Sequence, residues 1–127
     1  MTNQDVCTLA LRMTGECFPA TANDYLSRSP ALLVGVISSC INAENAYRAA
    51  KGISPIEWSA PANVVLGERF PLSDPLITPA AYELASLLTI NEDAEISQTL
   101  HKRFEETLHQ LLFASAPIEQ AYPNLLQ

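Results

Sequence analysis

The stretch from Pro30 to Gly52 constrains the fold of this 127-residue chain more than any other. Its apolar side chains recur at the three- and four-residue spacing of a helix, and most polar side chains fall on the opposite side. Ser29 and Pro30 supply a capping residue and a favoured first-turn proline, and Lys51 precedes a glycine stop. At about 1.5 Å per residue this helix spans roughly 30 Å, the width of a small domain. The apolar positions are Leu33, Val36, Ile37, Cys40, Ile41 and Tyr47.

Capping patterns place three further helices around this one. Thr2 with Asp5 and Thr21 with Asp24 each fit a capping box, while Thr78-Pro79 and Asp93 are typical helix starts. The sequence therefore predicts an all-α single domain over residues 1–127 that resembles a four-helix bundle, with a tail at 117–127. The expected helices cover residues 3–14, 23–51, 79–90 and 93–115, and the second has a kink or a break near Pro30.

Gly35 lies within the main helix, where glycine costs about 1 kcal/mol relative to alanine. We interpret it as a packing position that lets a neighbouring helix approach closely. The alternative is a functional role for this part of the backbone.

Residues 53–77 differ in character from the rest of the chain. The segment has no helical period, is rich in proline and contains the only tryptophan. The run 63–67 has strand composition, and Gly67-Glu68 is typical of a turn, so we expect a long extended loop or a short two-stranded β-ribbon. Loops of this length are usually functional or bound to a partner.

The large apolar residues of this segment allow two interpretations. They fold back onto the helices as a satellite cluster, or they pack against another chain. Under the second interpretation, the candidate partner or oligomer contacts are Trp58, Val64, Leu66, Arg69, Phe70 and Leu72.

The charge of the chain limits its partners. A net charge of −7 with seven scattered basic residues argues against a groove that grips a phosphate backbone. A surface past which DNA moves without binding is compatible with this charge. The apolar run from Ala31 to Ile37 is far shorter than the roughly 20 residues that span a bilayer, so no membrane partner is expected.

The cysteines and the N-terminal residues indicate a soluble intracellular protein. Cys7, Cys17 and Cys40 form no CxxC pair, and two of them lie on apolar stripes as expected for buried thiols. This pattern fits a reducing compartment, and the first residues lack the basic region of a secretory leader.

The sequence assigns no catalytic, cofactor-binding or metal-binding residues. It contains no nucleophile elbow, phosphate loop or dinucleotide-binding fingerprint, so we expect a protein that is not an enzyme. The best metal candidates are His101, Glu105 and His109, which lie on one face of the last helix. Only one Glu-x-x-His is present, whereas a di-metal bundle needs two such motifs, and a solvated polar face is the competing interpretation.

Three segments resemble a known family in the same order along the chain. Residues 3–15 (Asn-Gln-Asp-Val through Arg-Met-x-Gly), residues 66–76 (LGERFPLSDPL) and residues 80–88 (AAYELASLL) are similar to the opening helix, the extended segment and the third helix of small phage head–tail connector proteins. An acidic turn and a long final helix follow. The likeness covers most of the chain in layout, and its motifs are short.

The resemblance implies a non-enzymatic structural protein of a phage or prophage. Such a head-completion or adaptor subunit forms a ring with copies of itself between the portal protein and the tail-side proteins, on the path of the DNA. It resides in the virion after assembly and in the bacterial host cytoplasm before, where an isolated subunit can remain monomeric. The segment at about 57–74 would lie in contacts between subunits or between the ring and its partners. The alternatives are a cytosolic helical protein-interaction module and, less favoured, a metal-binding helical bundle.

Overall fold

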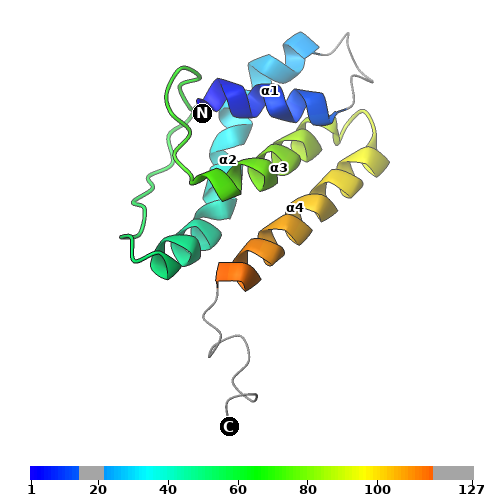
Figure 1. The fold of residues 1–127 in the computed structure, drawn as a ribbon. Helices are drawn as coiled ribbons and strands as arrows, with labels where there is room; N and C mark the ends of the chain where they lie inside the picture. The colour runs from blue at the N-terminus through cyan, green and yellow to red at the C-terminus, as the bar shows by residue number, and fades with distance from the viewer. Residues whose placement is uncertain (15–21, 116–127) are drawn as a thin grey trace.

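The computed structural model describes residues 1–14 and 22–115 of the chain, and these residues form one domain of packed helices (Figure 1). Within these ranges there is no β-strand, which confirms the prediction of an all-α domain with four helices. Thr21 of the second capping box and the tail at 117–127 lie outside the described residues. The elements are α1 (Asn3–Met13), α2 (Ala22–Ala50), the short 3-10 turn η2 (Asp74–Leu76), α3 (Ile77–Thr89) and α4 (Ala94–Ser115).

Helix α3 occupies the centre of the domain, although α2 is longer. It contacts α1, α2 and α4, and it forms an antiparallel hairpin with α4 (Figure 1). The reason is its composition, since nearly every side of α3 carries an apolar or small residue that can be buried. Its fully buried apolar side chains are Ala80, Ala81, Leu84, Ala85 and Leu88. The other helices bury one face each against them.

Helix α2 is continuous through Pro30, so the predicted alternative of a break is wrong. A proline inside a helix removes one backbone donor and leaves a carbonyl of the preceding turn without its usual partner. Ser29 does not cap a new helix; its hydroxyl donates to the carbonyl oxygen of Tyr25 at 2.7 Å and lies fully buried. The carbonyl that Pro30 leaves without its amide donor is that of Leu26, so the Ser29 bond does not replace the lost one, and α2 continues without it.

The helix ends follow the capping patterns at two of the predicted starts. Thr2 and Asp5 form the reciprocal capping box at the start of α1. The Oδ1 atom of Asp93 accepts from the amides of Glu95 and Ile96 at 3.1 Å, which caps α4. Helix α3 begins at Ile77, two residues before the predicted start, because the turn η2 leads directly into it and Pro79 is tolerated in its first turn.

Two features of α2 bear on expectations from the sequence. A Cβ atom added at Gly35 would meet no atom within 4 Å, so the predicted close approach of a neighbouring helix is wrong. The stretch Asp24–Ala50 is long and apolar enough to cross a membrane by length and composition, with 39% of the tested window buried. The core helix of a soluble protein passes the same test.

Candidate interaction surface

The connection between α2 and α3 is a long loop, and its first half follows the outside of α2. The amide of Ile56 donates to Oδ1 of Asn45 at 2.9 Å, and Nε1 of Trp58 donates to the Ser38 hydroxyl at 2.9 Å. Further along, the amide of Val64 donates to the carbonyl oxygen of Pro30 at 3.1 Å. The loop therefore runs antiparallel to α2 and is held at three points.

The second half of the loop pairs with the first residues of the chain. The amides of Asn3 and Gln4 donate to the carbonyl oxygens of Glu68 and Leu66, both at 2.9 Å, and the Phe70 amide donates to Met1 at 3.0 Å. Nδ2 of Asn3 also donates to the Val65 carbonyl at 2.9 Å. Only an isolated bridge between Thr2 and Arg69 has β geometry, so the loop alternative holds and the predicted two-stranded ribbon is absent from the described residues.

Glu44 fixes the end of the loop where it joins η2. Its side chain is fully buried and accepts from the amide and the hydroxyl of Ser73 at 2.7 and 2.6 Å. Arg48, one turn along α2, donates to the same carboxylate at 2.6 Å. Burial raises the pKa of Glu44, but the hydrogen bonds from Ser73 and the ion pair with Arg48 outweigh this effect and lower the pKa below its usual value.

The sequence did not single out Glu44 as an anchor of this loop. Glutamate followed four residues later by arginine is the usual pattern of an exposed helix pair. The partner that removes Glu44 from solvent, Ser73, is 29 residues away in sequence. A signal was nevertheless present, because Ser73 and Asp74 precede a proline in the manner of a helix start.

The structure divides the six candidate contact residues into three groups. Phe70 and Leu72 are 3% and 5% exposed and belong to the core of their own chain, so their side chains are not available to a partner. Trp58, Val64 and Leu66 are half-buried against that core. Arg69 is exposed. The interpretation of the segment as a satellite cluster thus applies to Phe70 and Leu72, while the outer part of the loop stays a candidate contact.

Two exposed apolar residues of the loop were not among the candidates. Val65 is 57% exposed at the outer turn of the loop, and Ile53 is 51% exposed at its beginning. Ile53 follows Gly52, whose positive φ of 71° ends α2 and directs the chain away from the helix axis. Their large exposure identifies them as the apolar part of this surface.

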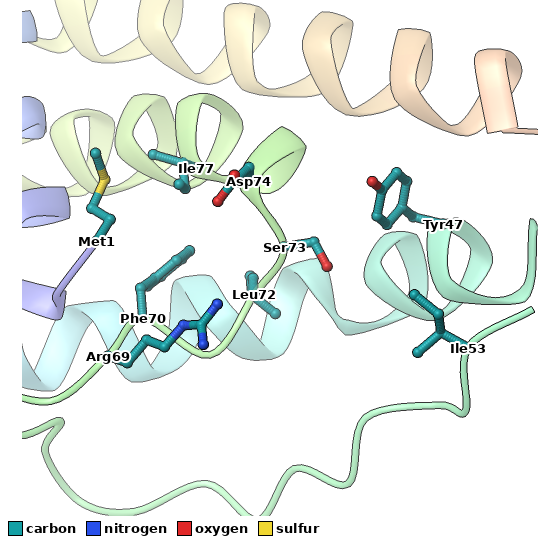
Figure 2. Close-up of a pocket in the computed structure, with 9 residues that line it drawn as sticks. All are labelled: Met1, Tyr47, Ile53, Arg69, Phe70, Leu72, Ser73, Asp74 and Ile77. Carbon is teal, nitrogen blue, oxygen red and sulfur yellow. The ribbon is translucent and has the colours of Figure 1, made fainter. Parts of the chain in front are cut away.

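A surface hollow of about 280 Å³ lies where the loop, α2 and α3 meet (Figure 2). Tyr47 and Ile53 stand on one side of it, Met1 and Phe70 stand on the other, and Leu72 lies between them. A second hollow of about 300 Å³ shares Phe70 and Leu72 with the first and is also lined by two arginines. The polar residues around the two hollows are Arg48, Arg69, Ser73 and Asp74.

The polar face of α4 holds a bridge to α3. The Nδ1 atom of His101 lies 2.9 Å from Glu83 and its Nε2 atom lies 2.8 Å from Glu105. The hydrogen bond with Glu83 is the largest influence on the pKa of His101 and raises it, as does the nearby Glu105 carboxylate. Of the predicted metal candidates, the structure brings His101 and Glu105 together, while His109 is exposed and lies outside this bridge. Residues 1–14 and 22–115 contain no group of three potential ligands in metal-binding arrangement.

The two cysteines that the structure describes are buried. Cys7 and Cys40 are fully inaccessible, as their positions on apolar stripes predict. Burial raises the pKa of the Cys40 thiol to about 12, and the carboxylates of Glu83 and Glu44 add to this rise. Both side chains therefore pack as small hydrophobic groups.

Comparison of the chain with family models, with curated proteins and with solved structures finds no match. What the protein does is therefore inferred from its own residues and from the resemblance of its three segments. The surface formed by the α2–α3 loop and the adjoining hollows is the candidate site, because exposed apolar side chains and basic side chains lie together there.

Proposed function

We propose that this chain is a structural subunit of a phage or prophage, a head–tail connector that forms a ring with copies of itself between the portal and the tail. This function needs no catalytic residue and no cofactor. Its partners are a second copy, the portal protein and the tail-side proteins, and DNA passes it without specific binding. The assembled subunit belongs to the virion, and the free subunit belongs to the host cytoplasm.

The observation that carries the proposal is the α2–α3 loop on the outside of the helices. The resembling segment 66–76 forms the second half of this loop and leads into the resembling helix, in the order that the connector family has. The loop is bound to its own chain at both ends yet leaves Val65 and Ile53 more than half exposed. Such a fixed, partly apolar surface suits a subunit that binds neighbours without a large rearrangement.

The charge of the chain supports the same function. A subunit that lines a DNA path must not hold the DNA, and a net charge of −7 repels phosphates. The basic residues are few and scattered, so the protein should bind DNA only weakly and should not slow its passage.

The test is electron microscopy of this protein co-expressed with the portal protein encoded in the same genome. We expect an additional ring of density on the portal. Val65→Asp, which places a charge on the exposed turn, is expected to reduce the occupancy of that ring. Leu112→Asp is the control, since Leu112 is also an exposed apolar residue but belongs to α4 and lines neither hollow. A portal that never carries additional density contradicts the proposal.

A protein-interaction module of the cytosol is the second candidate, and the exposure of Val65 favours it equally. Pull-down with the wild-type chain and with Val65→Asp separates the two functions. Loss of one non-virion partner in the variant, together with neighbouring genes that encode no portal, terminase or capsid, supports the module.

A further inference from the structure

The two ends of α3 carry surfaces of opposite character. The hollow lies at its first residue, Ile77, and the exposed Ile90 follows its last residue, Thr89. Because α3 has 13 residues, these surfaces lie about 20 Å apart on opposite sides of the domain. Figure 1 shows the loop and the α3–α4 turn at the two ends of this helix.

The hollow combines apolar walls with basic side chains. The exposed Ile53 and the half-buried Tyr47 and Ile77 supply its accessible apolar lining, beside the buried Phe70 and Leu72. Arg69 is exposed at its edge, and its guanidinium forms no ion pair with any residue that the structure describes. Arg48 borders the adjoining hollow but is already bound to Glu44.

The other charges near the hollow do not neutralise Arg69. Lys51 lies over the ring of Tyr47 at 5.6 Å and adds a second positive charge. Asp74 lines the hollow and Glu68 precedes Arg69 in the loop, and neither is paired with Arg69 among the described residues. Among the residues that line the hollow, Arg69 is therefore the cation that can bind a carboxylate from outside.

The α3–α4 turn has the complementary composition. Ile90 is 54% exposed, and the exposed carboxylates of Glu92 and Glu95 follow it. The cation at this end, Arg28, is occupied by the carboxylate of Asp24 and by the carbonyl oxygen of Leu88. The turn therefore presents an aliphatic side chain beside unpaired negative charge.

We propose that Ile90 of one copy of this chain inserts into the hollow between Tyr47, Ile53 and Ile77 of a second copy, where Glu92 binds Arg69. The inference rests on the proposed function and specifies its contact between subunits. The hollow of about 280 Å³ has room for one aliphatic side chain. Because the two surfaces differ and lie at opposite ends of α3, each copy can bind one neighbour at each end. Such a head-to-tail contact generates a ring when the rotation closes.

Cysteine cross-linking tests this contact directly. Ile53 lines the hollow and is exposed, so Ile53→Cys and Ile90→Cys place thiols on the two sides of the contact. Cys17→Ser serves as the background for all variants, and the buried Cys7 and Cys40 remain. A short bismaleimide should convert the double variant into a ladder of oligomers. Mixing the two single variants should give dimers only, and each single variant alone should give none.

Charge exchange tests the proposed ion pair. Arg69→Glu in the double-cysteine variant places like charges against Glu92 and should reduce cross-linking about tenfold or more. Adding Glu92→Arg restores opposite charges and should restore the ladder. Lys102→Glu is the matched control, because Lys102 is an exposed cation on α4 away from the hollow. An unchanged ladder with Arg69→Glu overturns the pairing.

The cross-linking is carried out on the lone protein and on the protein co-expressed with the portal. A ring on the portal without a cross-link between positions 53 and 90 overturns this contact and leaves the connector function standing. Cross-linked ladders without a ring support the contact and contradict the connector function. Equal dimer yields from the single variants alone overturn the head-to-tail arrangement.

Discussion

The two halves of the α2–α3 loop have similar numbers of prolines and large apolar residues, yet the domain uses them differently. The half from 53 to 64 is attached to α2 by scattered hydrogen bonds, among them those of Ile56, Trp58 and Val64, and is mostly exposed. The half from 65 to 73 pairs with the first residues of the chain and places Phe70 and Leu72 in the core. The second half is therefore part of the fold, and the first half is attached to its surface.

This difference shows which contacts hold a loop segment in place when it contains no helix or strand. Backbone pairing with residues 1–4, the buried Glu44 and two core side chains each fix a different point of the second half. Substitutions that remove these points should destabilise the whole domain, while substitutions in the first half should have local effects.

The largest effect is expected for Phe70→Ala. Removing a buried phenylalanine side chain loses its burial and leaves a cavity, so the free energy of unfolding should fall by about 3–5 kcal/mol. Ile53→Ala, in the first half of the loop and 51% exposed, is the control and should change it by less than about 0.5 kcal/mol. Urea unfolding measures both, and equal losses would remove the distinction between the two halves.

The second-largest effect is expected for Glu44→Ala, which should lower the free energy of unfolding by about 2–3 kcal/mol. The Ser73 amide loses its acceptor and Arg48 loses its ionic partner in a buried place. Glu44→Gln keeps an acceptor and should cost less. Urea unfolding of both variants compares their losses in the free energy of unfolding. A Glu44→Ala variant as stable as the wild type would mean that the loop end needs no anchor.

The pH dependence of the wild type gives a second measure of this anchor. The pKa of Glu44 is lower in the folded protein, so its carboxylate contributes full stability above the unfolded pKa of about 4.3. That contribution is lost as the pH falls through the lower folded value. The difference in stability between wild type and Glu44→Gln should therefore narrow in acid. A difference that is constant from neutral pH to about pH 3 would contradict this assignment.

Gly35 inside α2 and Gly52 just after its end should respond to alanine with stability changes of opposite sign. Gly35→Ala adds a methyl group that meets no atom within 4 Å in a helix interior, and it should raise the stability by about 1 kcal/mol. Gly52→Ala should lower it by a similar amount, because the positive φ that starts the loop is unfavourable for alanine. Thermal unfolding of the two variants measures both changes in stability. Changes of the same sign would contradict this prediction.

The smallest effect is expected for Ser38→Ala. It removes the hydrogen bond to Trp58 from the exposed half of the loop and should cost up to about 1 kcal/mol. Because Trp58 is the only tryptophan, its fluorescence emission should shift to longer wavelength as the ring gains water. Ser39→Ala is the matched control, since Ser39 bonds only to the Gly35 carbonyl within α2. Identical spectra for the two variants would show that the bond does not hold the ring.

The sequence predicted those parts of the fold whose signals are local. The capping box of Thr2 and Asp5, the cap at Asp93 and the apolar stripe that the sequence shows at three- and four-residue steps over 96–112 lie within a few residues of the structure that they determine. Leu100 and Phe104 are buried as that stripe predicts, while Leu112 near its end is 38% exposed.

The remaining parts depend on contacts between distant residues. The pairing of Asn3 with residues 65–68 and the bond between Glu44 and Ser73 join segments that have no common periodicity. Phe70 and Leu72 lie in a proline-rich stretch, so nothing in the pattern separates them from the exposed Val65. The sequence identified the segment as a candidate site, but only the tertiary contacts distinguish its core residues from its surface residues.

The two buried cysteines allow local opening of the domain to be measured by thiol labelling. A maleimide reacts with a thiolate that solvent can reach, so Cys7 on α1 and Cys40 on α2 are protected as long as their helices stay packed. The labelling rate at each position thus measures how often that helix exposes its inner side. Faster labelling at Cys7 than at Cys40 would reveal that α1 separates first, and equal rates would reveal that the helices open together.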